Sequence, residues 1–219
     1  MSRNKNPEIR INYSGLLTSD VSAKIAELKK WDLKSDEQYE KWTEAFCQSW
    51  NKHGDAILAE MQIITGLEFY LPVIDITVSP CIIPKSQPLI IGFKDTPETV
   101  IETITHELSH TLLCDNKIIS IYGKDRDFML GNEWRKLFGF EDDFTALVHI
   151  PVHAICQKVF QDSLGDKTYV KRDRKLMEDL GATSYLKSWD YVEQEGADLI
   201  IEKLKKSYLE IAKRLEKQK

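Results

Sequence analysis

The chain has 219 residues, of which 42% are hydrophobic and 30% are charged, with 10 Gly and 7 Pro. This composition is typical of a soluble globular protein and excludes a disordered or fibrous chain. The 30 basic and 35 acidic residues give a net charge of -5, which provides no general basic field, so nucleic acid is not expected as a partner.

The N-terminus and the apolar segments predict a cytoplasmic protein that does not enter a membrane. Arg3, Lys5 and Arg10 are not followed by the apolar segment of a secretory signal. The longest apolar runs, around Ile63 and Ile82, are interrupted by Gly, Glu or Pro and fall short of the roughly 18 residues that a membrane-spanning helix needs. The four cysteines form no C-x-x-C pair, and we expect them to be reduced thiols.

The order of the predicted elements indicates an α+β fold that is predominantly helical, with a small mixed or antiparallel sheet in the first half. We expect a single domain over 1–219, because the chain is long enough for one core and contains no linker-like segment. Within it we distinguish an N-terminal helical part (1–70), a core with the sheet and the candidate site (73–160), and C-terminal helices (161–219).

Helical periodicity dominates the first part of the chain. From Ser19 to Thr65 the sequence is rich in helix formers and contains no proline. This pattern predicts two helices that are separated near Asp32 to Asp36. The aromatic residues Trp42, Phe46 and Trp50 are four residues apart, and we assign this stripe to core packing.

The period then changes, first to that of strands and next to that of a helix. Between Val73 and Lys94 the apolar residues alternate and three prolines mark turns, which indicates strands of a small sheet, with antiparallel pairing favoured. Thr96-Pro97-Glu98 has the cap, the proline and the acid that are typical of a helix start. We expect this helix to extend from Pro97 to about Cys114.

Three further helical patterns follow the polar segment Asp115 to Asp127. They cover Asn132 to Phe138, Asp142 to Phe160, and the region from Arg172 to the C-terminus. In the last region Lys and Glu are interspersed, so we expect a packing helix with a solvated face rather than a nucleic-acid arm.

The predicted helix that ends near Cys114 contains the motif H-E-x-x-H, formed by His106, Glu107 and His110. Residues four apart on a helix lie one turn apart and about 40° around the axis, so both imidazoles can reach one ion. Glu107 points near enough to the same side to hold a water on that ion without being a ligand. The opposite side of the helix carries apolar residues for the core: Ile101, Ile104, Leu108 and Leu112. The alternative is an accidental motif, in which both histidines have ordinary structural roles.

A catalytic zinc site needs a third protein ligand and one open position. The segment from Glu141 to His153 contains both downstream histidines and three carboxylates. We favour His149 as the third ligand, followed by His153 and then by Glu141. Pro151 lies between the two histidines and is expected to start or kink a helix there, which would turn their side chains in different directions.

Other polar residues are weaker candidates for a role in the metal site. Asp142 or Asp143 is a candidate for the carboxylate that orients a ligating imidazole, and solvent exposure is the alternative for both. Glu133 is a weaker candidate for a metal ligand. The fifth histidine, His53, lies upstream and is assigned to a surface helix.

On these residues, the stretch from Val73 to about Phe160 resembles a zincin metallopeptidase. In that clan a mixed sheet precedes the H-E-x-x-H helix and a later segment provides the third ligand. The resemblance implies that His106 and His110 bind Zn²⁺, that Glu107 is the general base, and that the substrate is a peptide or a protein. Zinc would lower the pKa of its bound water toward about 7, and the glutamate would pass the proton to the leaving amine.

Within the clan, the pattern departs from some families and is similar to another. Thr111 to Asp115 lack the glycine and the third histidine of the metzincin extension. Phe144-Thr145-Ala146 followed by Pro151 is similar to the ImmA/IrrE-type cytoplasmic zincins, whose third ligand is a helical glutamate. Here the nearest acid, Glu141, is one position out of register, and His149 replaces an apolar residue.

Two further parts of an active site have candidates in the sequence. The strand Leu89 to Phe93 is either the sheet edge on which an extended peptide pairs or an ordinary internal strand. Tyr122 and Tyr169 are candidate oxyanion donors, with a structural role as the alternative. The alternative function for the whole chain is a zincin-like binding or regulatory protein without proteolytic turnover.

Overall fold

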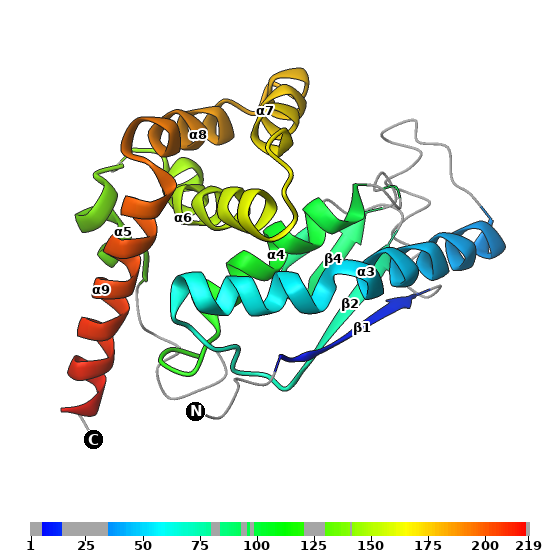
Figure 1. Cartoon of the computed structure of the whole chain (residues 1–219), viewed down its shortest axis with the longest axis horizontal. Coiled ribbons are helices and arrows are strands. Elements are labelled where there is room, and N and C mark those ends of the chain that lie inside the picture. The colour runs from blue at the N-terminus through cyan, green and yellow to red at the C-terminus, as the bar shows by residue number, and fades with distance from the viewer. Residues whose placement is uncertain are drawn as a thin grey trace. The chain divides into compact units, whose positions relative to one another are not determined.

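The computed structural model shows an α+β protein in which helices predominate and a small sheet precedes the helix with the H-E-x-x-H motif (Figure 1). The predicted fold class is confirmed. The structure describes residues 6–14, 35–79, 84–92, 96, 99–120, 130–140 and 142–217. The chain divides into two compact units, the first formed by Met1–Leu58 and Leu71–Thr111 and the second by Ala59–Tyr70 and Leu112–Lys219.

The first unit contains a four-stranded mixed sheet. Its strands are β1 (Glu8–Tyr13), β2 (Val73–Ser79), β3 (Lys85–Ser86) and β4 (Leu89–Gly92), in the order β1-β2-β4-β3. The pairs β1 with β2 and β2 with β4 are parallel, and only β3 with β4 is antiparallel. The sheet is therefore mixed, which is one of the two expected arrangements, and the favoured antiparallel pairing is found only between β3 and β4. The reason is that β1 reaches β2 through a long helix, and such a crossover returns the chain in the same direction.

The position of β4 corrects a second expectation. β4 pairs with β2 on one side and with β3 on the other, and all four of its residues are buried. The described part of the Leu89 to Phe93 strand is therefore internal, and it is not the edge on which a peptide could pair. At the edges of the described sheet lie β1 and the two-residue strand β3.

The helix α3 (Asp36–Thr65) connects β1 to β2. It starts where the second predicted helix was expected, while the first predicted helix lies outside the described residues. Tyr13 at the end of β1 donates a hydrogen bond to Asp36 (2.7 Å) and its ring stacks on Tyr39, so the start of α3 packs against β1. Gly54 lies within α3 because the indole of Trp50 occupies the space that a Cβ would need; this close packing explains a residue that otherwise weakens a helix.

The helix α4 (Val100–Cys114) carries the H-E-x-x-H motif and ends at the predicted residue. At its start, the backbone N–H groups of Thr96 and Thr99 each donate to the other residue's hydroxyl (2.9 and 3.4 Å), so Thr96 has the capping role that was predicted. Residues 97 and 98 lie outside the described residues. The apolar face is buried as expected, and it comprises Ile101, Ile104, Leu108 and Leu112.

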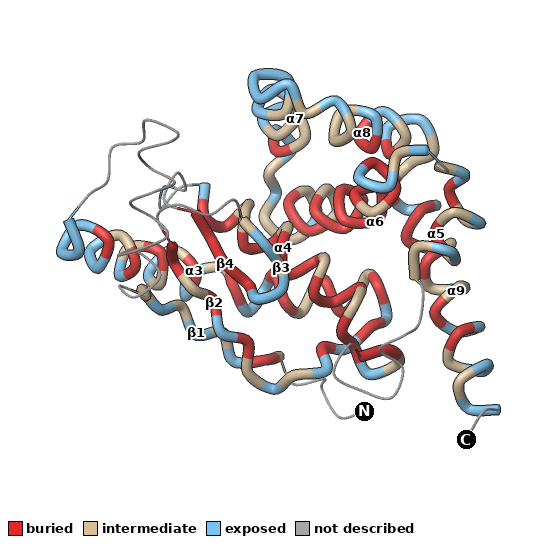
Figure 2. The backbone as a smooth tube through the Cα atoms, turned by 180° about the vertical axis from the view of Figure 1, so that it is seen from behind, coloured by how far each residue is buried: buried red, intermediate tan, exposed pale blue. Residues whose placement is uncertain are grey.

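The second unit is a group of helices around α6, whose middle is almost wholly buried (Figure 2). The bounds of its helices are α5 Leu130–Phe138, α6 Phe144–Lys158, a π-helical turn Val159–Ser163, α7 Tyr169–Asp179, α8 Thr183–Glu195 and α9 Ala197–Glu216. α5, α8 and α9 all pack against α6. The predicted helices in this region are confirmed, with shifts of a few residues at their ends. No helix in the described part of the chain is long and apolar enough to span a membrane.

Pro151 lies inside α6 and neither starts nor ends it. The expectation that it starts a helix is therefore wrong. A proline within a helix removes one backbone hydrogen bond. However, α6 packs against α5, α8 and α9, and this packing keeps the helix intact despite the missing bond. As a consequence, His149 and His153 remain on one helix, with ring centroids 5.7 Å apart.

Candidate metal centre

The α4 part of the site contains the two motif histidines and the glutamate between them. The rings of His106 and His110 lie 5.0 Å apart between centroids, as expected for residues one turn apart. Glu107 is buried, with 7% of its surface exposed. The hydroxyls of Ser109 and Thr111 donate to carbonyls four residues earlier on the same helix, so these hydrogen bonds lie within α4. The helix thus presents two imidazoles and one carboxylate.

The α6 part of the candidate site is His149, whose imidazole is buried and hydrogen-bonded. It is 6% exposed, and its Nδ1–H donates a 2.7 Å hydrogen bond to the carbonyl of Thr145. Because a neutral imidazole carries one proton, this bond leaves the lone pair on Nε2. Burial lowers the pKa of His149 to about 4, against the opposing effect of the bond to Thr145. The ring is therefore neutral near pH 7, which metal binding requires.

The structure brings His106, His110 and His149 together. Each offers one ring nitrogen, and these three atoms lie within 4.8 Å of one another. In a tetrahedral zinc site the ligand nitrogens are about 3.4 Å apart, because each bond to the ion is about 2.1 Å long. Small side-chain adjustments would therefore bring three nitrogens onto one ion. A set of three imidazoles also leaves a fourth position open, as catalytic zinc sites do.

Of the two alternatives for the third ligand, His153 lies within the described residues, and it is not part of this group. His153 is fully buried. Its Nδ1–H donates to Ser188 Oγ (2.9 Å), and its ring stacks on Trp189 at 4.2 Å and 11°, so it belongs to the packing between α6 and α8. Glu141 lies outside the described residues.

The acidic residues near the site have other roles. Asp143 is the N-cap of α6: it accepts from the backbone N–H of Ala146 (3.0 Å) and also pairs with Lys187 (2.9 Å). These bonds, that of Ala146 first, lower the pKa of Asp143 below its usual range. The group that orients His149 is the Thr145 carbonyl, so the expected carboxylate role does not fall to Asp143, while Asp142 is exposed. Capping is the commonest role for an aspartate just before a helix.

Two other candidates from the sequence, one for a metal ligand and one for an oxyanion donor, form structural contacts instead. Glu133 pairs with Arg214 (3.1 Å) and Lys136 (3.1 Å), and the pKa of its carboxyl is lowered mainly by the bond from Arg214. Tyr169 is buried and stacks on Phe160, which is the structural alternative for this tyrosine. The other proposed oxyanion donor, Tyr122, lies outside the described residues.

Sequence reasoning missed Tyr185, whose ring lies 4.0 Å from that of His149 between centroids. Tyr185, Ser188 and Trp189 are spaced i, i+3 and i+4 on α8, so they share one face of that helix. All three contact a histidine of α6. This spacing was visible in the sequence, but nothing local indicated which helix the face would meet.

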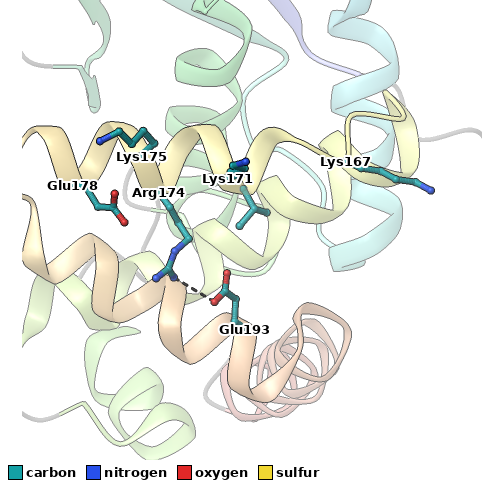
Figure 3. Close-up of a pocket in the computed structure, with 7 residues that line it drawn as sticks. Lys167, Lys171, Arg174, Lys175, Glu178 and Glu193 are labelled. Atoms are coloured by element: carbon teal, nitrogen blue, oxygen red, sulfur yellow. Dashed lines mark ion pairs between the residues drawn. The ribbon is translucent and has the colours of Figure 1, made fainter.

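A separate pocket of about 520 Å³ lies between α7 and α8 (Figure 3). Its charged lining includes both signs, and the guanidinium of Arg174 reaches across it to Glu193 (3.5 Å) and also pairs with Asp190 (2.7 Å). These ion pairs join α7 to α8. The pocket contains none of the histidines and is not part of the metal centre.

The lowered pKa of His149 predicts how the metal-free protein responds to acid. An unfolded histidine titrates near 6.5, whereas His149 in the fold titrates at about 4. Between these values this residue binds more protons in the unfolded chain than in the fold, so its contribution to the free energy of unfolding decreases as the pH falls from about 6.5 to about 4. The slope from this residue approaches about 1.4 kcal/mol per pH unit at most.

Denaturant unfolding of the metal-free protein at several pH values measures this slope. His149→Phe removes the titrating group and keeps a ring, and we expect a shallower dependence between pH 6.5 and 4 than in the unaltered chain, as the shift above requires. Equal slopes in the two proteins would show that His149 is not held neutral by the fold.

No protein-family model, characterised protein or solved structure matches this chain. The interpretation of the site therefore depends on its own residues and their geometry.

Proposed function

We propose that the chain is a zinc-dependent hydrolase of the zincin type, a metallopeptidase that acts on peptides or proteins. The observation that carries this proposal is the grouping of three imidazole nitrogens within 4.8 Å of one another, from His106, His110 and His149. The glutamate of the H-E-x-x-H motif lies on the same helix as two of them.

The donor set suits zinc. Imidazole nitrogen is a common zinc ligand, and three protein ligands leave the fourth position for water or substrate. The neutral state of His149 and its hydrogen bond to a backbone carbonyl match the arrangement of ligating histidines in metalloproteins. When bound, zinc supplies Lewis acidity, which lowers the pKa of a water toward about 7 and polarises a carbonyl group.

Glu107 supplies the proton transfers of the proposed reaction. Its carboxylate takes a proton from the attacking water and later delivers it to the nitrogen of the leaving amine. Its position follows from the helix, since Glu107 directly follows His106 and precedes His110 by three residues. Because the residue is almost fully buried, it acts where bulk water is largely excluded, which strengthens electrostatic interactions.

The edge strand β3 supports a peptide as the substrate. Thr111 directly follows His110 on α4, and its hydroxyl oxygen lies 3.4 Å from the carbonyl oxygen of Ser86 in β3. The edge of the sheet therefore lies beside the motif helix. An extended peptide can add to such an edge through main-chain hydrogen bonds, and it would then run past the histidines.

The test is the metal content of the purified chain combined with peptide hydrolysis. We expect about one zinc per chain, as for a single three-ligand site, with hydrolysis that a chelator abolishes and added zinc restores. A chain that binds no zinc would contradict the proposal. Stoichiometric zinc without turnover on a broad peptide library would instead support a zincin-like binding or regulatory protein.

A further inference from the structure

The face of α8 formed by Tyr185, Ser188 and Trp189 contacts α6 at both of its histidines. The ring of Tyr185 lies 4.0 Å from the ring of His149 and 6.0 Å from that of His153. Trp189 stacks on His153 from the same helix. One surface of α8 therefore covers the two imidazoles.

The polar atoms of this surface form a chain that ends at Tyr185. His153 Nδ1–H donates to Ser188 Oγ (2.9 Å), and the hydroxyl of Ser188 donates to the backbone carbonyl of Tyr185 (2.7 Å). Ser188 is fully buried, so these bonds are formed away from water and are costly to lose. They fix the backbone of α8 at the residue whose ring packs on His149.

Helix α8 is also held by α7. The indole N–H of Trp189 donates to the carboxylate of Asp173 on α7 (2.7 Å). Arg174 pairs with Asp190 and Glu193 across the neighbouring pocket (Figure 3). The contacts from α7 to α8 and from α8 to α6 form a continuous support for His149.

His149 needs such a support because its hydrogen bond alone does not fix the ring. The bond from Nδ1 to the Thr145 carbonyl sets one direction, but the outer torsion of a histidine side chain is broad. A ring packed against the imidazole face limits this rotation and so limits where Nε2 points. Groups that orient ligating histidines typically change metal affinity by about 10- to 100-fold when they are removed.

We propose that Tyr185 is a positioning residue of the metal centre: its ring holds the His149 imidazole in the orientation that presents Nε2 to the ion. This inference rests on the proposed metal function. It gives α8 a role that the H-E-x-x-H motif does not contain, and it assigns the role to the aromatic ring of Tyr185 rather than to its hydroxyl.

The test is a titration of the metal-free full chain with Co²⁺, whose visible spectrum reports the number and arrangement of its ligands. Tyr185→Leu removes the ring and is expected to weaken Co²⁺ binding by about tenfold or more and to alter the spectrum. Tyr185→Phe keeps the ring and is expected to bind within about threefold of the unaltered chain, because the packed face remains.

Tyr191→Leu is the matched control, since Tyr191 is on the same helix but packs against Phe138 and Phe140. It should lower the thermal midpoint and leave Co²⁺ affinity unchanged. If Tyr185→Leu does not fold, Tyr185→Met provides a flexible apolar replacement with the same expected weakening.

The outcomes of the Co²⁺ titrations separate the positioning role of Tyr185 from an effect on stability alone and from the absence of a metal site. A folded Tyr185→Leu or Tyr185→Met chain that binds Co²⁺ as tightly as the unaltered chain would overturn the positioning role. Equal weakening in Tyr191→Leu would also overturn it, because the effect would then follow stability alone. An unaltered chain that binds no Co²⁺ would instead remove the proposed metal function, and the positioning role with it.

Discussion

Glu107→Gln is expected to lower the rate of peptide hydrolysis by a factor of about 10² to 10⁴, which is the usual contribution of a positioned general base. The amide has nearly the same size as the carboxylate but cannot take up the proton of the attacking water. Because Glu107 is not among the three grouped histidines, bound zinc should stay at the level of the unaltered chain. Turnover and metal content, measured on the same preparation, check both parts.

The control is Glu102→Gln, the same substitution five residues earlier on α4. It should change neither turnover nor zinc content. Full activity in Glu107→Gln would remove this residue from the mechanism. Loss of zinc together with activity would show that Glu107 binds the ion or supports the fold, rather than acting on the water.

The second large effect is expected from His149→Ala, which removes one of the three grouped nitrogens. Zinc affinity should fall by more than about 100-fold, because even groups that only orient a ligand contribute about 10- to 100-fold. A competition titration with a chromophoric chelator measures this change. The same variant should lose hydrolysis in step with its loss of metal at a fixed zinc concentration.

His153→Ala separates ligation from packing on the same helix. His153 is buried, stacks on Trp189 and donates to Ser188, so its removal should mainly destabilise the fold. Loss of the buried hydrogen bond alone costs about 1–3 kcal/mol. The loss of zinc affinity should be much smaller than in His149→Ala. The reverse order of effects would make His153 the third ligand, and weak effects of both would favour Glu141.

The features that depend on residues close together in the sequence could be predicted from the sequence. The placement of His106, Glu107 and His110 on one helix follows from their i, i+1 and i+4 spacing within a segment of helical period. Its buried face follows from the same period, and its start follows from Thr96. The α+β class is also confirmed, since long helical periods surround one short segment with the period of strands. All of these signals come from residues that are close together in the sequence.

The strand pairing was not predictable in the same way. β1 alternates charged residues with apolar ones, and its partner β2 is some sixty residues later. No local signal distinguishes a parallel partner from an antiparallel one. The crossover through α3 makes β1 and β2 parallel, and the position of β3 makes β4 internal.

For the site, the sequence by itself determined two imidazoles and a carboxylate on one helix, because helical geometry is local. It limited the candidates for the third ligand to the segment from Glu141 to His153 but did not show which of them joins the other two histidines. Only the tertiary structure decided that His149 joins the group while His153 packs under Trp189, and that Tyr185 lies against His149. The physical reason is that α6 and α8 meet through residues about 35 positions apart, and that contact depends on the packing of the whole second unit.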